Sequence, residues 1–452
     1  MEYTELAAYP LPDGALTVWT PTCGEAAWRG DARAISHDHE ALLADARSGA
    51  WIGSVMRVPV RYDQGAVRRA LRAWIDRHEV LRSTVVRDGA GWRRKSVSAD
   101  TVDVAARTVG NVSADEAHEL ISGFFGGVSA LTWPHCLFAT VEEPGEEAFV
   151  VAFGADHSVM DAYSQLLWFQ EFMSLYTRAL SGEPDSRLAA LDVGSHVDHS
   201  AAARSLDAVI GEDDPTVRRW RDYLADGFPA CAAVPSAPDA DGQQHSLSRW
   251  VAGPDVAAEA ERVCRGLGTG TQAGVLAAFG RAVAARTGDD RIRFVLPMHT
   301  RHDRRHVDAV GWYVGLCPVE FDLADATGFP EAVHIVRAGV SAVRACAKAS
   351  FTRVAQLLGA TGEPRFVVSY VDVRQVAGAD RWTDWRARAL RAPEPSRDEV
   401  YLWFIHSAHG INVSARCAPS DAAVAAVADL IAGFGDELAR AARAPAAIEV
   451  CA

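Results

Sequence analysis

The sequence predicts a mixed α/β protein, of the α/β or α+β class, made of two halves of similar style. Two observations support this prediction. Strand-like and helix-like patterns alternate through residues 1–180, and the same mixture returns after a loop-rich middle. The chain has 452 residues, 49% of them hydrophobic, so it can bury a large core. We expect two domains, 1–180 and 181–452, each with an antiparallel-looking sheet.

The first half contains the clearest periodic patterns. Residues 66–78 carry apolar side chains at helical spacing, and Ser113 is suited to cap a helix over 114–124. A further long helix is expected over 162–180. Strands are expected over 55–62, 80–86, 92–97, 136–141 and 149–153.

The second half begins with a stretch, 181–215, that we expect to be rich in loops, and residues 229–244 resemble a linker. Periodic patterns then resume. Helices are expected over 215–225, 256–267, 271–286, 330–347, 351–358 and 422–442, and strands over 292–298, 317–321, 366–370, 400–407 and 411–416.

Composition excludes several classes of protein. The net charge of -14 argues against nucleic-acid binding, which normally needs a basic face. The first residues form no signal peptide, and no apolar run is long enough to span a membrane. The eight cysteines form no CxxC pair, so we expect ordinary buried thiols in a reducing cytoplasm.

One short segment, 155–164, suggests chemistry. It follows an apolar strand and contains His157 and, four residues later, Asp161. A neutral imidazole can take a proton from a hydroxyl or an amine, and the end of a strand combines a rigid position with access for a substrate. A bare HxxxD pattern is a weak signal, so its interpretation depends on other motifs that occur in order around it.

Four segments in order resemble the condensation-domain superfamily of acyltransferases, whose signature is HHxxxDG. Residues 77–83 (RHEVLRS) resemble the RHExLRT segment, and residues 156–164 (DHSVMDAYS) resemble HHxxxDGxS. Arg301 follows the strand around 294–297 where the family has Gly-Arg, and residues 310–319 (VGWYVGLCPV) resemble VGxFVNTLPV. Residues 14–19, 368–374 and 398–403 add a resemblance to free-standing polyketide-associated acyltransferases.

This resemblance implies two chloramphenicol-acetyltransferase-like lobes in a pseudo-dimeric V, with the active site in a tunnel between them. It implies acyl transfer from a thioester to a hydroxyl of a small-molecule acceptor in lipid or natural-product biosynthesis, with His157 as the general base. An amide-forming condensation enzyme of nonribosomal peptide assembly and a catalytically inactive partner-binding member are the alternatives. The donor would be acyl-CoA or a phosphopantetheinyl acyl or peptidyl carrier protein, with no permanently bound cofactor. The family's usual state is a monomer.

The resemblance also assigns roles to further residues. Asp161 and Arg301 are expected to form a buried ion pair that positions the motif. The backbone N–H of Ala162 or the hydroxyl of Ser164 is the candidate donor to the oxyanion.

The remaining candidates carry less specific expectations. Trp312 and Tyr370 are candidates to line the tunnel, and Arg304 and Arg305 are candidates to contact the donor's phosphates, although a solvated loop is the competing interpretation. Three histidines at 299, 302 and 306 do not lie on a coherent helix, so no metal site is expected.

Three positions depart from the family's pattern. Asp156 stands where the family has its first motif histidine, Ala162 replaces the motif glycine, and Gly315 replaces an asparagine. Ala162 keeps its backbone N–H but narrows the φ angles open to the turn. Asp156 occupies a position that usually supports the catalytic histidine, and it is also a candidate to contact the oxyanion or the substrate.

Overall fold

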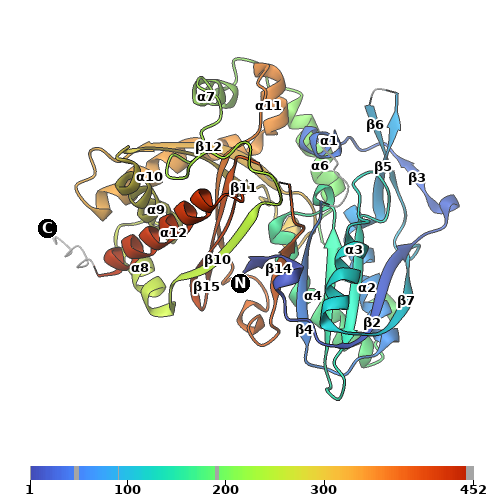
Figure 1. Cartoon of the computed structure of the whole chain (residues 1–452). Helices are drawn as coiled ribbons and strands as arrows, with labels where there is room; N and C mark the ends of the chain where they lie inside the picture. Colours follow the sequence, from blue (N-terminus) through green and yellow to red (C-terminus); the bar gives the residue numbers. More distant parts are fainter. Residues whose placement is uncertain (1, 45–49, 90, 189–192, 396, 444–452) are drawn as a thin grey trace.

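The structure, a computed structural model, describes residues 2–44, 50–89, 91–188, 193–395 and 397–443. Two lobes lie side by side, and each contains a large sheet with helices against it (Figure 1). The predicted mixed α/β, two-lobed architecture is confirmed.

The N-terminal lobe contains a seven-stranded sheet in the order β1-β14-β4-β9-β8-β2-β7. In that order, the strands are Tyr3–Thr4, Arg388–Arg391, Ile52–Val58, Phe149–Ala155, Cys136–Glu142, Gly14–Thr22 and Asp103–Val112. The central strand β9 is buried along its whole length and pairs antiparallel with β4 and β8. Its carboxyl end, which precedes the HxxxD segment, therefore lies in the middle of the sheet.

Helices cover both faces of this sheet because the side chains of each strand alternate between two apolar cores. Phe149, Val151 and Phe153 join the core shared with α2 (Gln64–Arg77) and α4 (Ala162–Leu180). Val150 and Ala152 face the opposite core, which includes residues of α3 (Ala114–Phe125). Ser113 caps α3 through a capping box, as the sequence indicates.

A small three-stranded sheet, β3-β6-β5 (Arg29–Asp31, Gly91–Ser96 and Ser83–Asp88), extends from this lobe. The hairpin of β5 and β6 is the one that the sequence predicts. Two shorter helices, α1 (His37–Ala44) and α6 (His196–Asp207), lie near the border of the lobes, and a third, α5 (Asp185–Leu188), packs against α2 and α4.

The C-terminal lobe has a six-stranded sheet in the order β10-β16-β15-β13-β11-β12. In that order, the strands are His245–Ala252, Gly410–Cys417, Val400–Ser407, Phe366–Asp372, Arg291–His299 and Val314–Asp322. The sheet is mixed rather than antiparallel, because β13 runs parallel to both β11 and β15. The expectation of an antiparallel sheet in this half is corrected accordingly.

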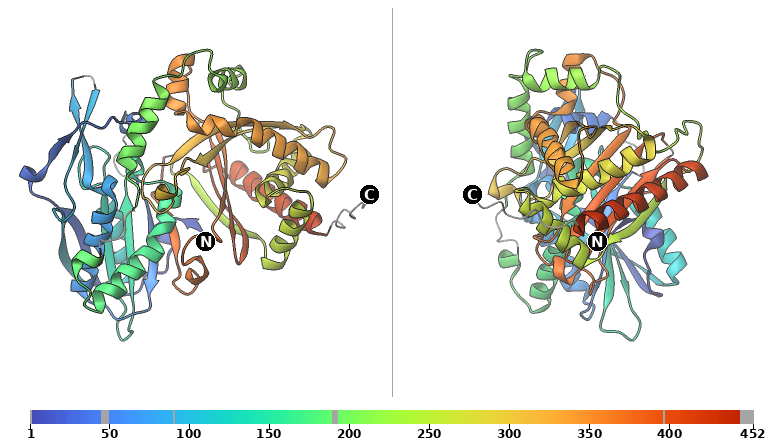
Figure 2. Two further views of the ribbon diagram at one scale, coloured as in Figure 1. Left: turned by 180° about the vertical axis from the view of Figure 1, so that it is seen from behind. Right: turned by 90° about the vertical axis from the view of Figure 1, so that its left-hand side faces the viewer.

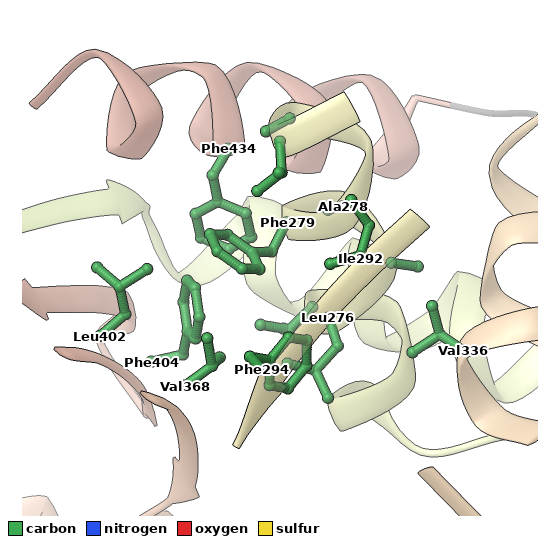
Figure 3. Packing of buried hydrophobic residues seen from close by; sticks show 14 of the residues in the cluster. Leu276, Ala278, Phe279, Ile292, Phe294, Val336, Val368, Leu402, Phe404 and Phe434 are labelled. Atoms are coloured by element: carbon green, nitrogen blue, oxygen red, sulfur yellow. The ribbon is translucent and has the colours of Figure 1, made fainter. Parts of the chain in front are cut away.

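One face of this sheet packs against four long helices, α8, α9, α10 and α12 (Pro254–Gly266, Thr271–Thr287, Phe329–Val343 and Asp421–Ala442). Phe279 of α9 lies 5.2 Å from the ring of Phe404 on β15, and Phe434 of α12 lies 4.8 Å from that same ring (Figure 3). The opposite face carries α7 (Pro215–Tyr223) and α11 (Phe351–Leu358), which share a smaller cluster with Val295 and Val367.

The second half of the sequence contributes one strand to the sheet of the N-terminal lobe. Strand β14 comes from the second half of the sequence but pairs with β4 of the N-terminal sheet, and β1 adds to its other edge. Gln165 of α4 donates to the carbonyl oxygens of Gly53 and Leu390, which ties β4 and β14 to the helix that follows the motif. A division at residue 180 stays a prediction, and the segment 388–391 crosses it.

Two views of the molecule show α6 beside α1 and α11 where the lobes meet (Figures 1 and 2). This helix lies in the stretch where loops were expected, so that expectation is corrected. Its buried face consists largely of His196, Val197 and Ser200, and polar side chains conceal the helical period. Among the helices of the described residues, none has the length and apolar character needed to cross a membrane.

Candidate active site

The turn after β9 presents His157 to solvent while its neighbours are buried. Asp156 caps the short 3-10 helix His157–Val159 by accepting a hydrogen bond of 2.8 Å from the backbone N–H of Ser158. The backbone N–H of Asp156 donates to the carbonyl of His135 at 2.9 Å. Asp156 and Ser158 are buried, whereas His157 is exposed. The residue that replaces the family's first histidine thus supports the turn that holds His157.

The imidazole of His157 is oriented by its own loop. Its Nδ1 lies 2.7 Å from the carbonyl oxygen of Met160. A carbonyl oxygen only accepts hydrogen bonds, so Nδ1 must carry the proton, and in the neutral ring Nε2 keeps a free lone pair. The ring of Trp312 contacts the imidazole edge-on, with centroids 4.9 Å apart. Nε2 is therefore the nitrogen of His157 that can accept a proton.

Asp161 holds the loop rather than the imidazole. Its carboxylate caps α4 by accepting from the backbone N–H of Ser164 at 2.7 Å, and it accepts from the backbone N–H of Tyr313 at 3.0 Å. Arg301 completes the set with a bidentate contact of 2.6 and 2.9 Å. Burial raises the pKa of the Asp161 carboxyl, but the charge and hydrogen bonds of Arg301 outweigh it, so the pKa lies below its ordinary value.

Arg301 follows β11 and joins the lobes through the expected ion pair. The side chains of Asp161 and Arg301 are 2% and 3% exposed, so water does not screen their attraction. The guanidinium carbon of Arg301 lies over the rings of Tyr163 and Tyr313, 4.9 and 4.3 Å from their centroids. It also donates to the carbonyl of Ala309 at 3.2 Å. These contacts fix the start of α4 against the 309–313 segment of the other lobe.

The two candidate oxyanion donors differ in their surroundings. The Ser164 hydroxyl is fully buried and lies within 2.7–3.1 Å of Asp161, Arg301 and the backbone of Gly311. This hydroxyl is therefore part of the ion-pair network. Ala162 is half-buried and begins α4, where backbone N–H groups have no partner within the helix. The N–H of Ala162 is the better placed of the two candidates.

The other predicted site residues lie on β13 and on the turn that follows β11. Tyr370 is in β13, where its hydroxyl lies 3.1 Å from Nδ1 of His406. Arg304 and Arg305 are exposed in the 3-10 turn Arg304–His306, and Arg305 pairs with Asp303 at 2.7 Å. Within the described ranges, no group of three or more His, Cys, Asp or Glu residues is arranged to hold a metal ion.

Three residues that the sequence did not assign to the site contact its framework. The hydroxyl of Tyr3 in β1 donates to the carbonyl of Ala162 at 3.2 Å. Nδ1 of His78 accepts from the backbone N–H of Val310 at 3.3 Å, while Nε2 lies 2.9 Å from Glu171 of α4. The RHE motif thus contains a structural link between α4 and the 310–319 motif. Tyr3 and Glu171 lie outside the motifs, and no pattern in the sequence indicated their contacts with the site.

A cavity of about 150 Å³ lies beside the motif, between α1, α6 and the C-terminal lobe. Trp312, the residue that touches His157, forms part of its wall. The predicted tunnel through the molecule stays a prediction.

Comparison with known proteins places these features in a wider group. The family model described as "Condensation domain" matches residues 41–370. The curated protein 2'-acyl-2-O-sulfo-trehalose (hydroxy)phthioceranyltransferase PapA1 of Mycobacterium tuberculosis is 25% identical over 317 residues, which is 69% of this chain and 60% of PapA1. Bacitracin synthase 1 of Bacillus licheniformis is 24% identical over 291 residues, 61% of this chain and 5% of the synthase.

Solved structures show the same fold. The PapA2 acyl transferase superposes with a TM-score of 0.85 at 19% identity, covering 98% of this chain and 100% of PapA2. The epimerization domain of tyrocidine synthetase B, TycB3(E), gives a TM-score of 0.71 at 16% identity, over 93% and 98% of the two chains.

Proposed function

The chain belongs to the condensation-domain family, and on that premise we propose that it is an acyltransferase that moves an acyl group from a thioester to a hydroxyl of a small-molecule acceptor. The observation that carries the proposal is the exposure and orientation of the His157 imidazole. The imidazole is exposed, Nδ1 is held by the Met160 carbonyl, and Nε2 is left with a lone pair. A positioned base of this kind serves to activate an incoming nucleophile.

The reaction proceeds without an acyl-enzyme. Nε2 of His157 takes the proton of the acceptor hydroxyl as its oxygen attacks the thioester carbonyl. The negative charge that develops on the carbonyl oxygen is stabilised by a backbone donor, for which the N–H of Ala162 is best placed. Collapse of this intermediate breaks the carbon–sulfur bond, and the departing thiolate recovers the proton from His157.

The thioester is acyl-CoA or an acyl group on a phosphopantetheinyl carrier protein. Both donors carry phosphate, and Arg304 and Arg305 are exposed cationic groups that could contact it. Asp161 and Arg301 act on the reaction through position alone, because their charges are buried in their mutual contact. One chain supplies the motif loop and its partner Arg301, which supports a monomeric enzyme.

A hydroxyl acceptor in lipid or natural-product biosynthesis is favoured by the likeness to PapA1 and PapA2, both named as transferases of acyl or phthioceranyl groups. The likeness to bacitracin synthase keeps amide formation as the second candidate, since the same base could serve an amine. An inactive, partner-binding role is disfavoured because His157 is both exposed and oriented.

The test is to incubate the purified chain with a panel of acyl-CoAs and acyl carrier proteins, each with an alcohol or an amine acceptor. Product mass and its sensitivity to mild base distinguish an ester from an amide. Ester formation supports the proposal, amide formation selects the second candidate, and no product with any pair overturns both.

A further inference from the structure

We propose that α6 is a strap between the two lobes, and that its first turn (residues 196–200) separates from the protein in mild acid. The helix lies where the lobes meet, beside α1 and α11 (Figures 1 and 2). Two of its histidines, His196 and His199, are the groups whose protonation drives the separation. The release involves no acyl transfer, so it is independent of the proposed function.

Polar contacts, rather than apolar packing, hold α6 in place. The helix buries four residues, and Val197 is the one apolar side chain among them. Leu206, its other large apolar residue, is 58% exposed. A helix that buries little apolar surface opens at a lower free energy than the core does. The first turn of α6 is therefore able to leave while both lobes stay folded.

The hydrogen bonds of the first turn reach both lobes. On one side, the hydroxyl of Ser200 accepts from the backbone N–H of Ser36 at 2.9 Å. On the other side, Nε2 of His199 lies 3.2 Å from the hydroxyl of Thr300, which follows β11. The turn thus joins the segment before α1 to the C-terminal lobe.

His196 connects this turn to the candidate active site. Its Nε2 donates to the carbonyl oxygen of Trp312 at 2.9 Å, and the ring of Trp312 contacts the imidazole of His157. The ring of His196 also packs against Gly311, where a Cβ would lie 2.4 Å from Cγ of His196. Release of the turn therefore removes a donor and a packing partner from the segment that contacts the base.

The closed structure has no acceptor for a second proton on His196. Because Nε2 already carries the proton that it donates to Trp312, a second proton must go to Nδ1. Nδ1 is buried and has no hydrogen-bond partner among the residues that the structure describes. A buried, charged N–H without an acceptor is costly, whereas water accepts its hydrogen bond once the turn is released. Protonation of His196 therefore favours release.

The groups around His196 repel a proton as well. The ring of His39 on α1 lies 6.4 Å from that of His196, and the ring of His199 lies 6.0 Å from it. Arg94 of β6 is a fixed positive charge near both His39 and His196. Burial lowers the pKa of His196 well below its ordinary value, and His199, His39 and Arg94 lower this pKa further, against a raising effect of the Trp312 carbonyl.

The surroundings of His199 act in the same direction. The ring of His306 lies 5.4 Å away, and Arg301 and His302 are further groups that repel a proton on His199. Asp161 attracts such a proton, but its carboxylate is already paired with Arg301. Burial, followed by His306 and Arg301, lowers the pKa of His199 to about 4.

Two further titratable groups face both histidines. The ring of Tyr313 lies 5.1 Å from that of His196 and 4.6 Å from that of His199, and burial raises the pKa of its phenol, which stays neutral in acid. Lys348 lines the cavity that both histidines line, and it carries a positive charge. Neither group supplies a negative charge that would hold a proton on the closed helix.

Two groups of α1 act in the opposite direction. His37 pairs with Asp207 at 2.9 Å, so a proton on His37 tightens this contact. Burial raises the pKa of the Asp38 carboxyl, so acid favours its buried form. However, Asp207 is the last residue of α6, and Asp38 is hydrogen-bonded to Thr352 of α11. Both groups therefore leave the first turn of α6 free to open.

Hydrogen exchange measures the release, because a helical amide exchanges only when its hydrogen bond opens. Protection factors of the amides of residues 199–203, corrected for intrinsic exchange, are compared at pH 7.5 and pH 5.5. A solvated histidine titrates near pH 6.5, so each histidine that is protonated only after release raises the opening constant about tenfold over this interval. With His196 and His199 together, protection should fall about 100-fold. A fall of less than tenfold, or a rise, overturns the proposal.

Helix α10 is the internal control, because its one histidine, His334, is exposed. Its amides should be better protected than those of α6 at both pH values. Equal protection of the two helices would mean that α6 leaves only when the whole protein unfolds, which also overturns the proposal.

A pair of variants locates the effect. In His199→Gln the side chain can still bond to Thr300 but cannot take up a proton, so the fall in α6 protection should shrink to about tenfold. His334→Gln should keep the parental fall of about 100-fold. Equal falls in the two variants contradict the role of His199. If His199→Gln does not fold, the parental comparison of α6 with α10 still decides whether the strap is released.

Discussion

Nδ1 of His157 lies 2.7 Å from the carbonyl oxygen of Met160, three residues further along the same turn. The contact assigns the proton of the neutral ring to Nδ1 and directs the lone pair of Nε2 outward. Many catalytic histidines are oriented by a carboxylate, but here the nearby carboxylate of Asp161 is fully used by Arg301, Ser164 and Tyr313. In this motif, therefore, His157 is the residue suited to proton transfer, and Asp161 positions the loop.

Removal of one partner of the buried Asp161–Arg301 pair is expected to destabilise the protein strongly. Asp161→Asn leaves the buried guanidinium without its counter-charge, which should lower the free energy of unfolding by about 3–5 kcal/mol. Urea denaturation measures this loss. Arg291→Gln is the control, because the Arg291–Glu320 pair is exposed and should cost about 1 kcal/mol or less. Similar losses in the two variants would contradict a buried positioning role.

Asp156 is expected to act through its cap on the turn. Asp156→Ala removes the acceptor for the Ser158 N–H and should cost about 0.5–2 kcal/mol, whereas Asp156→Asn keeps an acceptor and should stay close to the parent. Thermal unfolding compares the three proteins. An Asn variant as unstable as the Ala variant would show that the charge of Asp156, rather than its cap, is required.

Gly315 is expected to tolerate no side chain. Gly315→Asn restores the family's residue but forces a Cβ against the carbonyl of Ala347, so it should destabilise the protein by about 1–3 kcal/mol or more. Gly211→Ala is the matched control, since a Cβ there meets nothing within 4 Å. Denaturant unfolding distinguishes them, and a stable Gly315→Asn protein would refute the packing argument.

Stability is expected to fall in mild acid because two histidines at the border of the lobes, the buried His39 and the half-buried His199, resist protonation. Burial lowers the pKa of His199 to about 4, with further lowering by His306 and Arg301, and burial likewise lowers the pKa of His39 to about 3. An unfolded histidine titrates near pH 6.5 and so binds protons first as the pH drops. The free energy of unfolding is therefore not reduced by these histidines above about pH 6.5, and it falls progressively as the pH drops below that value.

Each such histidine should cost about 1 kcal/mol of unfolding free energy between about pH 7.5 and pH 5.5. Urea titrations at the two pH values measure the difference. His199→Asn should reduce this pH dependence, whereas His334→Ala, at an exposed position of α10, should leave it unchanged. A parent protein with equal stability at both pH values would contradict the account.

The parts of the fold that the sequence predicted are those in which one face is apolar throughout. Strand β9 and helix α4 show such patterns and appear where expected. Strand β7 has little buried surface beyond Val104, so alternation does not reveal it, and α6 hides its period behind polar buried residues. Strand β14 joins the other lobe through long-range pairing, which a local pattern does not encode.

The sequence likewise indicated some residues of the site and not others, because motifs reveal side chains but not backbone contacts or long-range pairs. His157, Asp161 and Arg301 were assigned by resemblance, and the structure brings the last two into contact. The contact that orients the imidazole involves the backbone of Met160, and a backbone carbonyl has no signature in a sequence. Tyr3 lies 159 residues before Ala162 in the sequence, so its contact with Ala162 is visible only in the folded chain.

The most direct test of the central claim is single-turnover acyl transfer by His157→Ala, with a donor and acceptor that the parent protein uses. The account predicts a loss of about 10²- to 10⁴-fold in the rate of the chemical step, with unfolding free energy unchanged because His157 is exposed. His334→Ala should transfer at the parental rate. A His157→Ala protein that transfers the acyl group as fast as its parent would contradict the assignment of His157 as the base.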